Sequence, residues 1–188
     1  MNRPLIVLFV GVPGSGKTTF ARQLATEIRA IHVTSDGVRS AMWGDRSAVD
    51  AAFSTKSQRQ TNNLLVFGAL DYVTLQTMNA GHSVVYDCNS NRYNERADKY
   101  ELAKRYGGVV VTVRIKVPYD VALRRMQQRD ESHDVLQFSP EKAKQVLDQF
   151  TKSIQEPDNH ENVIYIDGEV SFDVQLATFN AAIDKLTN

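Results

Sequence analysis

The sequence has very little cysteine, no excess of either charge and no hydrophobic run long enough to cross a membrane. Its single cysteine, Cys88, excludes an internal disulfide and a cysteine-rich zinc site, which fits a reduced, cytoplasmic setting. The 22 Lys and Arg residues balance 22 Asp and Glu residues, so the chain lacks the positive charge typical of proteins that coat nucleic acid or anionic membranes. Any recognition of phosphate must therefore be local.

Internal repeats, low-complexity segments and linkers are also missing from the sequence. Of the 188 residues, 42% are hydrophobic and 23% are charged, which is close to the average of soluble globular domains. This composition excludes disorder as the default state, and the length is too short for two ordinary domains and a linker. We expect residues 1–188 to form a single domain.

The start of the chain imitates a short signal peptide, because Arg3 precedes the apolar run Leu5–Val10. The run is short, and a glycine-rich segment follows it where a cleavage site would stand. We therefore interpret Leu5–Val10 as a buried parallel strand.

Residues 11–18, Gly-Val-Pro-Gly-Ser-Gly-Lys-Thr, match the G-x-x-x-x-G-K-[ST] pattern of the P-loop, between the first predicted strand and a helix. Glycines let backbone N–H groups curl around phosphate oxygens, and the helix directs its positive end at the same anion. Lys17 is placed to reach the β- and γ-phosphates, and the Thr18 hydroxyl to join the shell of a Mg²⁺ ion. The residues expected to bind ATP are Gly11, Pro13, Gly14, Ser15, Gly16, Lys17, Thr18 and Thr19.

Three other nucleotide-binding classes fit poorly. A dinucleotide fingerprint needs a third glycine where the sequence has Thr19. No Asn-Lys-x-Asp segment is present to read guanine, and no glutamate stands beside Asp87 to activate water, as ATP-driven motors usually require. Asp87 follows a predicted strand and can hold Mg²⁺ through water, although a carboxylate at a strand end can also serve only as a cap.

The rest of the chain alternates strands and helices. Strands are expected at Leu5–Val10, Ile31–Thr34, 83–86, 109–117 and 162–166. Helices are expected to begin at Lys17, after Pro118 and at Ser139, and to span 93–106 and 172–186. A further long helix is expected to carry Val66, Leu70, Val73 and Thr77 on one apolar face. Residues 38–56 are expected to be irregular, and residues 129–139 lack clear periodicity. This order predicts an α/β, three-layer P-loop NTPase fold: a five-stranded, mostly parallel sheet, helices on both faces and a small helical lid at about 124–140.

Two further groups of polar residues are candidates for catalysis. Asp36 follows the second predicted strand, at the sheet edge that faces the P-loop, where a carboxylate could accept the proton of an acceptor hydroxyl. Arg39, three residues later, could hold an anionic part of the acceptor. The alternatives are a helix cap for Asp36 and a solvated surface charge for Arg39.

Arg125 and Arg129 stand four residues apart, before the segment without clear periodicity. A mobile flap could bring them onto the triphosphate, where they would neutralise charge and exclude water. The alternative is the solvated basic face of an amphipathic helix.

The four histidines show no metal-ligand spacing and are interpreted as structural or exposed. Trp43 and Phe53 could line an acceptor pocket or the core.

In order and spacing, these motifs resemble the kinase domain of phage-type polynucleotide kinase and its small P-loop kinase relatives, the zeta-toxin-like and chloramphenicol phosphotransferase-like enzymes. The resemblance runs from about Leu5 to Asp167. It implies that Asp36, in an Asp-x-x-Arg motif, is the general base, that Arg39 engages the acceptor, and that Arg125 and Arg129 match the lid arginines.

The sequence therefore predicts an ATP-dependent phosphotransferase that moves the γ-phosphate to a hydroxyl acceptor. The expected catalytic residues are Lys17, Asp36, Arg39, Arg125 and Arg129, and the expected Mg²⁺ ligands are Thr18 and Asp87. A small-molecule acceptor is favoured over a nucleic-acid 5′-hydroxyl, because the neutral chain has no basic stripe interleaved with aromatics. The alternative is an ATP-binding switch whose hydrolysis is slow and incidental. No membrane partner is expected, and the sequence leaves the acceptor and the oligomeric state open.

Overall fold

The computed structural model of the chain describes residues 3–128 and 139–187. Its centre is one five-stranded sheet in the order β2-β3-β1-β4-β5, and every pair of neighbouring strands is parallel. The strands are β1 (Leu5–Val10), β2 (Ile31–Thr34), β3 (Val84–Asn89), β4 (Val109–Lys116) and β5 (Val163–Asp167). The predicted parallel sheet is confirmed, with all five strands within a few residues of their expected positions.

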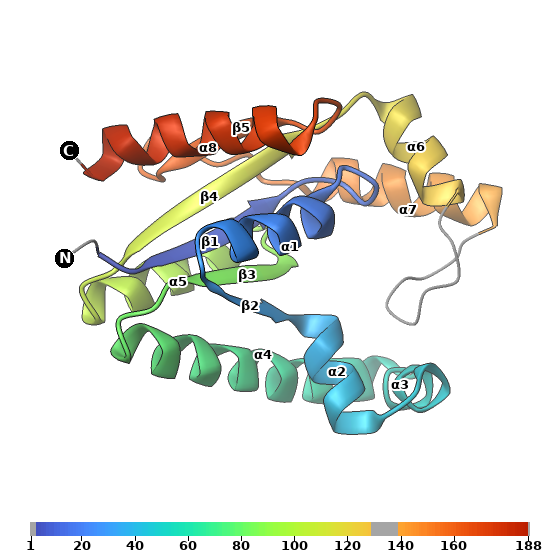
Figure 1. Cartoon of the computed structure of the whole chain (residues 1–188). Coiled ribbons are helices and arrows are strands. Elements are labelled where there is room, and N and C mark those ends of the chain that lie inside the picture. The colour runs from blue at the N-terminus through green and yellow to red at the C-terminus, as the bar shows by residue number, and fades with distance from the viewer. Residues whose placement is uncertain (1–2, 129–138, 188) are drawn as a thin grey trace.

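Helices cover both faces of the sheet (Figure 1). On one face, α1 (Lys17–Glu27) and α8 (Phe172–Thr187) enclose a core in which Phe20 and Phe179 pack against β1. On the other face, α4 (Lys56–Asn79) and α5 (Tyr93–Arg105) enclose a second core around Leu70 and Tyr86. β1 is buried on both sides, as the inner strand of a three-layer fold must be. The predicted α/β three-layer architecture is therefore confirmed.

The segment predicted as irregular, residues 38–56, is mostly helical, so that prediction was wrong. α2 (Ser35–Trp43) and α3 (Arg46–Ala52) occupy it. The Thr34 hydroxyl accepts a hydrogen bond from the Gly37 N–H, and Asp45 caps α3 in the same way through the Ala48 N–H. Neither helix has a fully buried side chain. Both are short, at nine and seven residues, so few turns are available in which an apolar period could be recognised in the sequence.

The long helix α4 begins with a capping box, in which the Thr55 hydroxyl accepts from the Gln58 N–H and the Gln58 side chain accepts from the Thr55 N–H. Its buried residues are Val66, Leu70, Thr74 and Met78. The expected stripe was correct at Val66 and Leu70 but wrong beyond them, because Val73 is 40% exposed. A buried threonine at position 74 breaks the simple apolar pattern.

β3 runs further than the sequence indicated and contains a bulge. Leu8 pairs with Tyr86, but Phe9 pairs with Asn89, so two residues of β3 have no partner on β1. These residues are Asp87 and Cys88. Bulges re-aim side chains at the ends of strands, and this one lies where β3 approaches the P-loop.

α6 (Tyr119–Gln127) and α7 (Pro140–Ser153) form a separate pair beside the sheet. Ala122 and Met126 of α6 pack on Ala143 and Leu147 of α7. The predicted start of α7 is confirmed, because the Ser139 hydroxyl accepts from the Lys142 N–H and proline stands at the first helical position. Of the lid expected at about 124–140, residues 129–138 lie outside the described part of the chain. None of the helices in residues 3–128 and 139–187 is long and apolar enough to cross a membrane.

Candidate active site

The P-loop joins the buried end of β1 to the first turn of α1 through two left-handed glycines, Gly14 (φ 81°) and Gly16 (φ 96°). L-residues rarely adopt this backbone conformation. A Cβ on Gly14 would also collide with the backbone oxygen of Ala122 in α6. The glycines therefore provide both the turn and the close approach of α6.

The start of α1 fits a phosphate group. Gly16 is the N-cap and offers no side chain to the first N–H groups of the helix. The Ser15 hydroxyl is fully buried and has no hydrogen-bond partner among residues 3–128 and 139–187. Pro13 is half-buried beside them, and Thr18 and Thr19 are exposed in the first turn. Uncapped amides and an orphaned hydroxyl are the donors that an anion at a helix N-terminus requires.

Lys17 folds back over the loop instead of extending into solvent. Its Nζ donates to the backbone oxygen of Gly11 at 2.8 Å and to that of Val12 at 2.9 Å. The ammonium therefore lies across the opening of the loop, where a bound triphosphate would compete for its donors.

Asn91 holds the beginning of the P-loop, a role that the sequence analysis missed. The Gly11 N–H donates to Asn91 Oδ1 at 2.9 Å, and Asn91 Nδ2 donates to the Gly11 oxygen at 3.3 Å. Asn91 is 2% exposed, and its own backbone oxygen accepts from Gln155 N at 2.8 Å. The side chain thus completes the backbone hydrogen bonds of a residue that has left the sheet.

Thr18 and Asp87, the two expected Mg²⁺ ligands, are brought together. Thr18 Oγ1 donates to Asp87 Oδ1 at 3.3 Å, and the Asp87 side chain is 6% exposed. The second carboxylate oxygen, Oδ2, lies 3.2 Å from Nε2 of His32. His32 therefore belongs to the site, and its interpretation as merely structural or exposed was incomplete.

The position of His32 follows from strand register. Thr34 pairs with Asp87 across β2 and β3, so His32 is the diagonal neighbour two residues earlier. Val33 faces the core around Leu70. Because successive side chains of a strand point to opposite faces of the sheet, His32 points toward α1, where Thr18 lies in the first turn. Period-two alternation along β2 was the signal that could have found it.

Cys88, the residue after Asp87, has an unreactive thiol. Burial and the neighbouring Asp87 carboxylate raise the pKa of its thiol to about 12. A thiol with such a pKa stays protonated at neutral pH and is a poor nucleophile.

Asp36 and Arg39 lie in α2, after the end of β2. Arg39 Nη1 donates to Asp36 Oδ1 at 2.9 Å, and Nη2 donates to Asn63 Oδ1 of α4 at 3.0 Å. The Asp36 side chain is 63% exposed, whereas that of Arg39 is 20% exposed. The cap of α2 is Thr34, so capping does not explain Asp36, and Arg39 is not a solvated surface charge.

Phe53 supports Arg39 from beneath. The Arg39 guanidinium lies 5.2 Å from the centre of the Phe53 ring, and Trp43 packs edge-on against that ring at 5.3 Å. Both aromatic residues join the core around Leu70. Trp43 and Phe53 are half-buried and lie at the margin of that core, and Phe53 also presents one face to Arg39.

Arg125 reaches the P-loop from α6. Its Nη1 donates to the Gly168 oxygen at 2.9 Å and lies 4.0 Å from where a Cβ of Gly16 would stand. Gly168 follows β5, and a Cβ there would stand 2.5 Å from the Ser15 oxygen. α6 ends at Gln127, and Arg129 lies outside the described residues.

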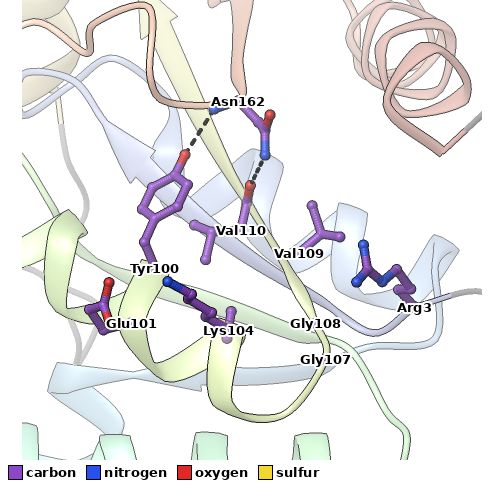
Figure 2. A pocket seen from close by; sticks show the side chains of 10 residues that line it. Arg3, Tyr100, Glu101, Lys104, Gly107, Gly108, Val109, Val110 and Asn162 are labelled. Atoms are coloured by element: carbon purple, nitrogen blue, oxygen red, sulfur yellow. Dashed lines mark hydrogen bonds between the residues drawn. The ribbon is translucent and has the colours of Figure 1, made fainter.

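One cavity opens at each end of the strands. One, of about 390 Å³, lies beside Val12 between the end of β4 and α7. The other, of about 400 Å³, lies where β1 and β4 begin, and Figure 2 shows Arg3, Tyr100 and Lys104 around it. Ligands of open α/β sheets bind outside the carboxyl ends of the strands, so only the first cavity adjoins the candidate site.

Comparison with solved structures shows that several proteins named as kinases share this fold. A sugar kinase from Janibacter sp. HTCC2649 matches with a TM-score of 0.66 and 17% identity, over 97% of this chain and 95% of that one. A gluconokinase from Sinorhizobium meliloti 1021 matches with a TM-score of 0.66 and 15% identity, over 98% and 93%. The Mycobacterium tuberculosis APS kinase, solved with AMPPNP and APS, matches with a TM-score of 0.65 and 17% identity, over 98% and 99%.

Comparison at the sequence level gives a family. No curated protein matches the chain. The family model described as AAA domain matches residues 6–157, which is most of the chain and includes the P-loop, Asp36, Asp87 and Arg125. The chain therefore belongs to the AAA domain family, and it has the fold of the small P-loop kinases.

Proposed function

We propose that the chain is an ATP-dependent phosphotransferase that moves the γ-phosphate of ATP to a hydroxyl acceptor. The observation that carries this proposal is the meeting of three groups at one sheet edge. The P-loop follows β1, Asp87 lies near the end of β3, and Asp36 follows β2. Neighbouring parallel strands thus bring the P-loop, the Asp87 carboxylate and the exposed Asp36 carboxylate to the same end of the sheet, where folds of this kind bind their ligands.

The nucleotide half of the site rests on the P-loop. The N–H groups at the start of α1, the Ser15 hydroxyl and the Lys17 ammonium would bind the phosphates. Thr18 Oγ1 directly, and Asp87 through water, would hold Mg²⁺, which neutralises phosphate charge when bound. This donor set fits Mg²⁺, which prefers one or two protein oxygens together with water and phosphate.

In the transfer half of the site, Asp36 would accept the proton of the acceptor hydroxyl. The acceptor oxygen then forms a bond to the γ-phosphorus as the bond from that phosphorus to the oxygen of the ADP leaving group breaks. Arg39, fixed by Asn63 and Phe53, would orient the acceptor. Arg125, beside Gly16, would offset the negative charge of the phosphates, and we keep Arg129 as a second candidate for that role.

A small hydroxyl-bearing molecule is the acceptor class that we favour. The structures that share the fold bear the names sugar kinase, gluconokinase and APS kinase. The narrower relation to phage-type polynucleotide kinase, with a nucleic-acid 5′-hydroxyl acceptor, has less support, because the 22 basic and 22 acidic residues leave the chain neutral.

The test is ATP consumption with and without a panel of acceptors comprising sugars, nucleosides, antibiotics and 5′-hydroxyl oligonucleotides. A kinase is stimulated strongly by one class, and the labelled phosphate appears on that acceptor. Slow turnover that no acceptor stimulates supports the alternative, a nucleotide-dependent switch.

A pair of matched variants then tests the catalytic carboxylate. Asp36→Asn should lower the transfer rate by about 10²–10⁴-fold while ATP binding, measured by calorimetry, stays unchanged. Asp50→Asn is the control, because Asp50 is also exposed and also pairs with an arginine on its own helix, Arg46. Equal activity of the two variants would remove Asp36 from the proposed role.

A further inference from the structure

The outward side of α4 carries an apolar stripe that the core does not use. Leu64, Leu65 and Tyr72 are 76%, 52% and 63% exposed, although α4 buries its opposite side against the sheet. Figure 1 shows α4 along the outside of the molecule, with no described element beyond it. A helix that is apolar on both sides is usually covered on both sides.

Leu65 and Tyr72 of this stripe lie on a line of residues with the spacing of a coiled-coil seam, and Leu64 flanks that line. Thr61, Leu65, Gly68, Tyr72, Leu75 and Asn79 follow one another at alternating steps of four and three residues, the heptad pattern of helices that pack along their length. From residue 60 to residue 79 the only charged side chain is Asp71, which pairs with Lys99 at 2.6 Å. No like charges therefore oppose the approach of another helix.

Gly68, at the middle of the seam, makes no close packing contact with the described part of the chain that would require a glycine. A Cβ built on it meets no atom within 4 Å, and its backbone is ordinary helix. Glycine inside a helix destabilises that helix relative to alanine, because it loses more backbone entropy on folding. A glycine that its own chain does not require is explained if another surface comes close at that point.

We propose that α4 packs against α4 of a second copy of this chain. The two helices run antiparallel and are related by a two-fold axis that crosses α4 at the level of residue 70. In this register, Tyr72 of each copy fills the space that Gly68 leaves on the other. Leu65 then faces Leu75, and at both ends of the seam the polar Thr61 faces Asn79. Each contact occurs twice, as a two-fold interface demands. The match of the largest seam residue to the smallest makes a second copy the occupant that fits this surface.

The size of the surface indicates a weak dimer. The seam from Thr61 to Asn79 is about 27 Å long, and its exposed apolar side chains are Leu65 and Tyr72. Two copies with their polar rims would bury on the order of 1,200 Å², the lower end of specific interfaces. We therefore expect a dimer that dissociates on dilution.

The test is sedimentation velocity of the full chain between about 1 and 100 µM. The parent should shift toward twice its mass with concentration. Gly68→Tyr should stay monomeric, because two tyrosines then meet in each of the central layers. The double variant Gly68→Tyr, Tyr72→Gly should dimerise again, because the exchange restores one tyrosine opposite one glycine. Val73→Ala, on the same helix but off the seam, is the control.

Two outcomes would overturn the proposal: a monomeric parent at the highest concentration, or a dimer that Gly68→Tyr leaves intact. Circular dichroism checks that each variant folds, which we expect because an added Cβ at position 68 meets nothing. Cross-linking gives a second readout on folded protein. Under mild oxidation, a mixture of Leu65→Cys and Leu75→Cys chains should form a disulfide between the two variants, and neither variant should do so alone. Cross-linking no stronger in the mixture than in the separate variants contradicts the register.

Discussion

His32 Nε2 lies 3.2 Å from Asp87 Oδ2, while Thr18 occupies the other oxygen of the same carboxylate at 3.3 Å. An ionised carboxylate only accepts hydrogen bonds, so Nε2 of His32 carries the hydrogen in this contact. The imidazole thereby fixes the rotation of Asp87 and leaves Oδ1 directed at α1. Groups that orient a metal-binding carboxylate in this way commonly tune metal affinity by 10- to 100-fold.

We expect His32→Ala to raise the Mg²⁺ concentration for half-maximal activity by about 10-fold, with a smaller effect on the rate at saturating Mg²⁺. Magnesium titrations at fixed ATP, together with calorimetry of Mg²⁺ binding to the ATP complex, measure the effect. His32→Gln retains a donor and should recover part of the affinity. His82→Ala, an exposed histidine, is the control, and identical titrations for the two alanine variants would show that the contact has no influence on the metal.

Asn91→Ala should weaken both the fold and the binding of ATP. The substitution leaves the N–H of buried Gly11 without its acceptor, a loss of about 1–3 kcal/mol in the free energy of unfolding. Because Gly11 begins the P-loop, the KM for ATP should also rise. Urea unfolding and steady-state kinetics measure the two effects. Asn94→Ala, an exposed position in α5, serves as control, and a variant as stable as this control would contradict the assigned role.

Gly14→Ala tests the packing of the P-loop against α6. Its φ of 81° is unfavourable for alanine by about 1–2 kcal/mol, and the collision with the Ala122 oxygen should add about 1–3 kcal/mol. Gly81→Ala separates these two costs, because Gly81 has a φ of 78° and open space around it. The melting temperature of Gly14→Ala should be well below that of Gly81→Ala. Equal melting temperatures would mean that α6 moves away from the added Cβ without a loss in the free energy of unfolding.

The sheet and the P-loop were the most predictable parts of the molecule. Leu5–Val10 is continuous apolar sequence because β1 is buried on both faces, and the glycine motif follows from the demands of phosphate binding. Both signals are local. The approximate position of Asp87 was predictable for the same reason, since the apolar residues of β3 lead directly to it.

The helices at the acceptor side and the supporting residues were not predictable in this way. α2 and α3 are nine and seven residues long, bury little, and are held by single caps and by contacts with α4, so each offers too few turns for an apolar period to be recognised. Asn91 and His32 act on residues 80 and 55 positions away. Their roles depend on the strand order and on the bulge at Asp87, which emerge only when the sheet is assembled.

The last prediction concerns Glu156, which receives hydrogen bonds from Arg114 Nε at 2.9 Å and Nη2 at 2.6 Å. The hydrogen bonds from Arg114 hold the pKa of the Glu156 carboxyl below its ordinary value of 4.5. A carboxyl whose pKa is lower in the folded state contributes stability above its unfolded pKa, and that contribution is lost as the pH falls through the folded pKa. The Glu156 side chain is 52% exposed, so solvent screening limits the contribution to about 0.5 kcal/mol.

Glu156→Gln should therefore be less stable than the parent at pH 7, and the difference should shrink toward zero as the pH falls below about 4. Urea unfolding of both proteins between pH 3 and pH 7 gives the two curves. Glu27→Gln, at an exposed position in α1, is the control for the loss of one acidic charge. A gap between Glu156→Gln and the parent that stays constant into acid would assign the stabilisation to packing of the long side chains instead of to the charge on Glu156.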